Sequence, residues 1–166
     1  MQTVEPLKGQ SAVGPSDYEK ERGKPMPNYS HGIIQANVTV ILGLQAGTTY
    51  RIASELTCEL PDGSVFTPDI SVLMRRPVNL GREPARCREV PVLAVEILSP
   101  SQGHQSVVEK IDAYFANGVQ SVWEINPALR LVAVYQPGAN HPEIFLRGEV
   151  KDSATNLIAR VEEIFA

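Results

Sequence analysis

The chain has 166 residues and a mass of 18.1 kDa, which suits one domain rather than two. Hydrophobic residues make up 43% of it and charged residues 20%, a balance typical of a globular protein and too apolar for disorder. A formal net charge of −4 argues against a general basic coat for nucleic acid but allows a local basic patch. No apolar run reaches about 18 residues, so no membrane span is predicted.

The N-terminal residues and the cysteines are typical of a cytoplasmic protein. The opening MQTVEPLKGQ has no basic-then-apolar pattern, so we expect no secretory signal. Cys58 and Cys87 have no His or Cys partners at zinc spacing and are too few for a disulfide scaffold. We therefore expect reduced thiols, with Cys58 as a small apolar filler in a strand.

The N-terminal third predicts two helices and a hairpin. Residues 1–14 are expected to be a loose end of a single domain that covers residues 1–166. Ser16 is a plausible N-cap for a short helix, and Gly47 is suited to ending a second helix. The expected elements are a helix over 16–21, a helix over 31–46, and strands over 50–60 and 65–73 joined by a turn at 61–64.

The rest of the chain predicts an α/β domain. Residues 74–89 contain proline and glycine without periodicity and are expected to form a long loop. A buried strand, a helix and a further strand follow in order, which favours a right-handed parallel crossover inside a mixed sheet flanked by helices. The expected elements are strands over 90–98, 121–125, 131–135 and 143–146, and helices over 104–117 and 159–165.

Two carboxylates are the sharpest chemical signal. Glu96 lies in the apolar run VPVLAVEIL, where a buried carboxylate is costly unless it is paired, protonated or bound to metal. Asp69 follows Pro68 in a strand whose alternation puts it on the face of Thr67 and Ser71. The alternative for Glu96 is a strand end that reaches solvent or an arginine partner. If the two strands are neighbours, the two acids converge at one end of the sheet.

A divalent cation would relieve the repulsion between two such carboxylates. Oxygen ligands without a Cys or His cluster favour Mg²⁺ or Mn²⁺. Lys110, on the helix after the Glu96 strand, is the candidate cation for charge that develops on phosphorus. It lies on one helical stripe with Val107 and Tyr114, and its alternative is an ordinary surface lysine.

Together these motifs resemble the Uma-type restriction-endonuclease family, a branch of the PD-(D/E)XK nuclease superfamily. Glu96 follows Asp69 by 27 residues, and the similarity extends over roughly residues 15 to 165. It rests on Pro68-Asp69, on VEILSPS (95–101), on Lys110 with Tyr114, on GV (118–119) and VWEINP (122–127), and upstream on Tyr18-Glu19, GKPMP (23–27) and His31.

The resemblance implies a restriction-endonuclease-like core and metal-dependent hydrolysis of phosphodiester bonds in DNA. Asp69 and Glu96 would be metal ligands with the main-chain carbonyl of Ile97, and Glu19 would be the additional acid from the first helix. His31 matches a family histidine without an assigned role, and its alternative is a helix-terminal histidine facing water. The superfamily pattern places a lysine two residues after the glutamate, where this chain has Leu98. Lys110 would then act from the helix.

A basic stretch separates the two acids. Residues 75–89 hold five arginines against two glutamates, a local balance of +3. Either this is a solvated loop, or its arginines neutralise DNA phosphates without reading bases. The candidates for that contact are Arg75, Arg76, Arg82 and Arg86.

Weaker candidates surround these residues. Glu55 and Glu59 share a face of the first predicted strand and either border the metal site or form a solvated face. Trp123 and Tyr135 are expected in the core or at an interface, because no aromatic series surrounds them.

The leading hypothesis is a Mg²⁺- or Mn²⁺-dependent DNA endonuclease, for which double-strand cutting would favour a homodimer. An inactive nuclease-fold module that binds DNA or protein is the alternative, and hydrolysis of another phosphoester is a third possibility.

Overall fold

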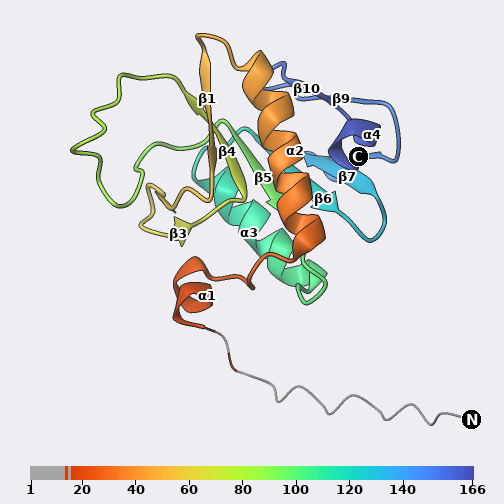
Figure 1. The fold of residues 1–166 in the computed structure, drawn as a ribbon, viewed down its shortest axis with the longest axis horizontal. Helices are drawn as coiled ribbons and strands as arrows, with labels where there is room; N and C mark the ends of the chain where they lie inside the picture. Colours follow the sequence, from red (N-terminus) through yellow and green to blue (C-terminus); the bar gives the residue numbers. More distant parts are fainter. Residues whose placement is uncertain (1–13, 15) are drawn as a thin grey trace, which may run out of the picture.

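The protein is described by a computed structural model that covers residue 14 and residues 16–166. The expected loose segment 1–14 therefore falls almost entirely outside the described residues. The elements, in chain order (Figure 1), are α1 (Asp17–Arg22), α2 (Tyr29–Gln45), β1 (Tyr50–Ser54), β2 (Cys58–Glu59), β3 (Val65–Phe66), β4 (Ile70–Met74), β5 (Leu93–Ile97), α3 (His104–Ala116), β6 (Ser121–Asn126), β7 (Leu131–Tyr135), β8 (Glu143–Phe145), β9 (Glu149–Lys151), β10 (Ile158–Arg160) and α4 (Val161–Ile164).

In the described part of the chain a six-stranded mixed sheet forms the centre, with strand order β1-β4-β5-β6-β7-β8. Within this sheet β5 and β6 pair in parallel, and the other neighbours are antiparallel. Helix α3 connects the parallel pair, as the order strand-helix-strand predicts. The expected α/β class with a mixed sheet is thus confirmed.

Two apolar layers cover the faces of the sheet. On one face α2, α4 and the β9–β10 pair pack against side chains such as Val95 and Trp123, which are fully buried. On the other face α3 and the β2–β3 pair pack against Ala94 and Val122. Glu96 belongs to the same alternating set as Ala94, so its side chain points towards α3 rather than α2. Within the described residues, none of the helices has the length and apolar character needed to cross a membrane.

Local capping fixes the two N-terminal helices. Ser16 caps α1 as predicted, and its hydroxyl accepts a hydrogen bond from the Glu19 amide. Helix α2 begins two residues earlier than expected, because the Asn28 side chain accepts from the His31 amide. It ends at Gln45, and Gly47 adopts the left-handed φ of 56° that a helix end favours.

The expectation of two continuous strands over 50–60 and 65–73 is wrong. Glu55 has a left-handed φ of 53° and ends β1, while residues 67–69 separate β3 from β4. The hairpin therefore divides: β1 pairs with β4 in the main sheet, and β2 pairs with β3 in a small one. The alternation changes across the break, since Phe66 packs towards α3 and Ile70 towards α2.

The predicted bounds also fail in three later places. The buried strand begins at Leu93 rather than residue 90, because Pro91 has no N–H to donate to a neighbouring strand. The long loop accordingly extends over 75–92. Sequence patterning missed the short strand β9 and assigned 159–160 to the last helix, whereas residues 158–160 form β10.

Candidate active site

The two predicted acids meet at one end of the central sheet. Strands β4 and β5 pair with Ile70 opposite Val95. Extending this antiparallel register by one residue places Asp69 opposite Glu96. Asp69 is fully buried and Glu96 is 4% exposed, so both carboxylates need partners within the protein.

Groups from three segments of the described chain contact the Asp69 carboxylate. The Lys24 ammonium donates to Oδ1 at 2.5 Å, and His31 Nε2 lies 3.1 Å from the same oxygen. The main-chain amide of Ile97 donates to Oδ2 at 2.7 Å. Burial acts to raise the pKa of this carboxyl, but the His31 hydrogen bond and the Lys24 charge outweigh it and hold the pKa below its usual value. Asp69 is therefore ionised at neutral pH.

The Glu96 carboxylate is held from α3. The Tyr114 hydroxyl donates to Oε1 at 2.6 Å, and the Lys110 ammonium lies 2.8 Å from the same oxygen. Lys24 approaches the other oxygen, Oε2, at 3.7 Å. Burial raises the pKa of the Tyr114 phenol well above its usual value, and the negative charge of Glu96 raises it further. The phenol therefore stays a hydrogen-bond donor.

His31 and Glu55 border the Asp69 side of the site. His31 is 2% exposed, so the alternative of a water-facing histidine is wrong. Ligand atoms of His31, Glu55 and Asp69 all lie within 4.8 Å of one another. Gln35 fixes this arrangement, because its side-chain amide donates to Glu55 Oε1 at 3.0 Å and to the Asp69 carbonyl at 2.9 Å. Glu59 does not belong to this cluster, and its Oε2 lies 3.7 Å from Arg86 Nη1.

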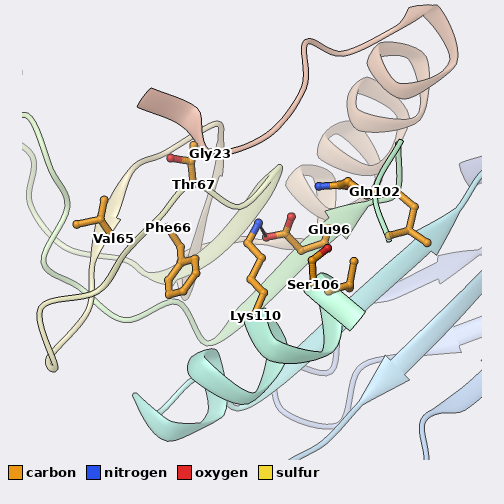
Figure 2. Close-up of a pocket in the computed structure, with 10 residues that line it drawn as sticks. Gly23, Val65, Phe66, Thr67, Glu96, Gln102, Ser106 and Lys110 are labelled. Carbon is orange, nitrogen blue, oxygen red and sulfur yellow. Dashed lines mark ion pairs between the residues drawn. The ribbon is translucent and has the colours of Figure 1, made fainter. Parts of the chain in front are cut away.

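A pocket of about 290 Å³ opens over Glu96 and Lys110. Figure 2 shows both side chains pointing towards each other, with Gly23 and Thr67 on one side and Gln102 and Ser106 on the other. The full lining is Gly23, Val65, Phe66, Thr67, Glu96, Leu98, Gln102, Ser106, Val107 and Lys110. The end of the sheet that carries Glu96 is thus reached by an open pocket although the carboxylate is buried.

Lys24 is a residue of the candidate site that sequence reasoning missed. Its side chain is 4% exposed and reaches both carboxylates from the segment between α1 and α2. Nothing in charge or periodicity distinguishes it from Lys20, whose side chain is 61% exposed. Only the family-like string GKPMP contained a signal, and that string assigns no role to the lysine.

The remaining candidates occupy other surroundings. The Glu19 carboxylate accepts hydrogen bonds from the amides of Ser16 and Met26, at 2.7 and 3.0 Å. Ile97 contributes its amide to Asp69, and metal binding by its carbonyl stays a prediction, as does a metal role for Glu19. Glu124, which sequence reasoning did not select, is 5% exposed and lies beside Glu96 in the β5–β6 register.

The arginine loop leaves the sheet at the end away from the acids. Arg75 donates to the Gly47 carbonyl beyond the C-terminus of α2, at 2.9 Å. Arg76 pairs with Glu83 and Glu89 within the loop. Since β4 spans five residues, this end lies roughly 15 Å from Asp69. DNA binding by these arginines stays a prediction.

The donor set suits a hard divalent cation. Asp69 and Glu96 offer carboxylate oxygens from facing strand positions, and His31 adds one nitrogen beside them. A mixed α/β sheet with paired acids at one end and a helical lysine beside them is the arrangement expected of a restriction-endonuclease-like fold.

The chain belongs to the Uma2 family, described as "Putative restriction endonuclease", whose pattern matches residues 21–158. This confirms the family resemblance found in the sequence. No curated protein matches the chain.

Two solved structures are similar to this one. A crystal structure of a "putative nuclease belonging to DUF820" from Anabaena variabilis ATCC 29413 has 27% sequence identity and a TM-score of 0.71, with 85% of this chain and 83% of that chain covered. A cryoEM structure of a DrdV–DNA complex has 16% identity and a TM-score of 0.43, with 67% and 10% covered. The Anabaena protein thus shares the fold over most of both chains.

Proposed function

We propose that this protein is a divalent-metal-dependent endonuclease that hydrolyses phosphodiester bonds in DNA, with Mg²⁺ or Mn²⁺ as its ion and the whole chain as one nuclease domain. The observation that carries the proposal is the facing pair Asp69 and Glu96 beneath a pocket that also contains Lys110. Membership of a restriction-endonuclease family supports nucleic acid as the phosphodiester.

Asp69 and Glu96 would hold the ion, which supplies an activated water and neutralises a phosphate oxygen when it is bound. Lys110 lines the pocket and reaches Glu96 from α3, so its ammonium can stabilise negative charge that develops on the phosphate. His31 and Lys24 keep the Asp69 carboxyl ionised, and the Ile97 amide orients it. Tyr114 orients Glu96 by its hydrogen bond to Oε1.

A polar surface extends beyond the pocket and suits a nucleic-acid strand. A second pocket, lined by Asn28, Ser30, Ser99 and Asn126 among others, shares Leu98 and Gln102 with the first. Hydroxyl and amide groups of this kind commonly bond to phosphate and sugar oxygens. The DNA strand would therefore run from the Glu96 pocket past Gln102.

The arginine loop offers a separate contact with more distant DNA. Its four candidates are Arg75, Arg76, Arg82 and Arg86. Replacing all four with alanine should flatten the dependence of DNA affinity on salt, because fewer counterions are released. Fluorescence anisotropy of a labelled duplex across a salt series measures this slope. An unchanged slope would remove the loop from the interface.

The test of the proposed function is cleavage of supercoiled plasmid with Mg²⁺ or Mn²⁺. The wild-type protein should nick the plasmid, and Asp69→Asn and Glu96→Gln should each abolish nicking. Glu59→Gln is the matched control, because Glu59 lies beside Arg86 rather than in the site. Nicking that survives both site substitutions would rule out the mechanism.

Size-exclusion chromatography of the protein with DNA tests the predicted homodimer.

One observation favours the second candidate, an inactive nuclease-fold module that binds DNA or protein. Lys24 and Lys110 already neutralise the two carboxylates, so the fold needs no metal for charge balance. Such a module requires binding of DNA or of a protein partner, without DNA cleavage under either ion. Plasmid nicking lost in Asp69→Asn would exclude it.

A further inference from the structure

The ammonium of Lys24 lies between the two carboxylates of the site. Its nitrogen is 2.5 Å from Asp69 Oδ1 and 3.7 Å from Glu96 Oε2. The Lys24 side chain is 4% exposed, so this cation is almost fully enclosed. Lys110 differs from Lys24 in its contact and in its exposure. Its ammonium contacts Glu96 Oε1, and its side chain is 18% exposed.

One oxygen of each carboxylate is held by protein groups other than Lys24. Asp69 Oδ2 accepts from the Ile97 amide, and Glu96 Oε1 accepts from Tyr114 and lies beside Lys110. The other oxygens of the pair are Asp69 Oδ1, which also lies 3.1 Å from His31 Nε2, and Glu96 Oε2. Lys24 approaches these same two oxygens.

A divalent ion and the Lys24 ammonium cannot occupy this place together. Mg²⁺ binds carboxylate oxygens at about 2.0–2.1 Å, and an ion held by both acids would compete with the ammonium for the carboxylate oxygens that it contacts. Two cations this close in a buried site would also repel strongly.

We infer that Lys24 is an internal counter-ion that takes the place of the divalent cation and must withdraw before the cation binds. This rests on the proposed function only in taking Asp69 and Glu96 as the metal-binding pair. In the metal-free protein Lys24 prevents two buried like charges from facing each other. When the ion binds, it competes with an intramolecular ammonium rather than entering a preformed acidic site.

The connection of Lys24 to the fold suits such a movement. Lys24 follows Gly23, which has a left-handed φ of 70° and ends the six-residue helix α1. Figure 1 shows α1 outside the layers formed by the sheet and α2. Gly23 itself lines the pocket over Glu96, so this segment forms part of the pocket wall. Withdrawal of Lys24 would therefore open the pocket as well as release the carboxylates.

The experiment measures Mn²⁺ binding by isothermal titration calorimetry for the wild-type protein and Lys24→Met. Removing the competitor should tighten Mn²⁺ binding at least about tenfold, a change of ~1.4 kcal/mol. Lys20→Met is the matched control, since Lys20 is a surface lysine four residues away and should leave the affinity unchanged. Adding Asp69→Asn to Lys24→Met should remove the gain.

A second measurement keeps the inference testable if Lys24→Met does not fold without metal. Hydrogen exchange of the wild-type protein is followed at the amides of residues 23–28, with and without saturating Mn²⁺. We expect faster exchange in this segment with Mn²⁺, because Lys24 no longer anchors it.

The outcomes separate this inference from the proposed function. Equal or weaker Mn²⁺ binding by Lys24→Met, or exchange at 23–28 that Mn²⁺ leaves unchanged or slows, overturns the internal counter-ion. If the wild-type protein still binds Mn²⁺ and nicks plasmid, the endonuclease proposal survives that result. Absence of Mn²⁺ binding in every variant removes both.

Discussion

The Tyr114 hydroxyl is the neutral group that orients Glu96, and its phenol is fully buried. A hydrogen bond to an ionised group is worth more than one between neutral groups. Tyr114→Phe should therefore lower the free energy of unfolding by about 1.5–3 kcal/mol, measured by urea denaturation.

The matched control is Tyr135→Phe. Tyr135 makes a longer bond of 3.4 Å to Glu124 Oε2 and is less buried, so the loss should be clearly smaller. Equal losses in the two variants would show that the Tyr114 bond to Glu96 has no special strength.

The two thiols should differ sharply in reactivity. Cys58 is fully buried, and burial together with the nearby Cys87 raises the pKa of its thiol to about 12. Cys87 is half-buried in the long loop. A chromogenic disulfide reagent at pH 8 should modify one thiol promptly and the second only after unfolding in urea. Prompt reaction of both would contradict the enclosed position of Cys58.

At the scale of elements, Arg76 organises the loop 75–92. Its guanidinium pairs with Glu83 and Glu89 of the same loop, and the hydrogen bonds to these carboxylates raise the pKa of Arg76 above its usual value. Arg76→Ala should speed hydrogen exchange across residues 77–89 without a measurable change in global stability, because surface ion pairs contribute about 0–1 kcal/mol.

Arg82→Ala, in the same loop, is the control. The described contacts give Arg82 a turn hydrogen bond from its main-chain amide to the Asn79 carbonyl, which an alanine retains. If Arg82→Ala loosened the loop as much as Arg76→Ala, the paired glutamates would not be what orders it.

At the scale of the whole molecule, the C-terminus closes the core. Ile164 lies two residues from the last residue and is fully buried with Val38 and Trp123 in the cluster on the α2 face. Ile164→Ala should lower the free energy of unfolding by about 2–5 kcal/mol. Leu44→Ala on α2, where the side chain is 84% exposed, should change it by less than about 0.5 kcal/mol. Urea denaturation followed by Trp123 fluorescence measures both.

The sequence indicated the fold and the acid pair because both follow from local regularities. The apolar run around Glu96 predicted a buried strand, and the acid pair followed on the condition that this strand lies beside the one at Asp69. The helix between β5 and β6 predicted their parallel pairing. Lys110 followed from its helical stripe. These patterns each span a few adjacent residues, so one sequence is enough to detect them.

What the sequence did not reveal depends on contacts between distant segments. Lys24 is a site residue only because a connecting segment folds back onto strands that begin 46 residues later, at Ile70. The break at Glu55 arises from a left-handed conformation that a glutamate rarely adopts. The short strands β9 and β10 are stabilised by each other and by the core, not by propensity.

Strands β4 and β5 pair in antiparallel fashion, and this pairing sets how close the two acids lie in space. The number of residues between the acids in the sequence does not affect that distance. Asp69 precedes the first residue of β4 and Glu96 is near the last of β5, so the chain between them travels away from the site and returns. Insertions or deletions at the tip of the 75–92 loop would change the spacing in the sequence and leave the carboxylates opposite each other. Homologues should therefore vary in the number of residues between these acids, and searches that require a fixed interval would miss some of them.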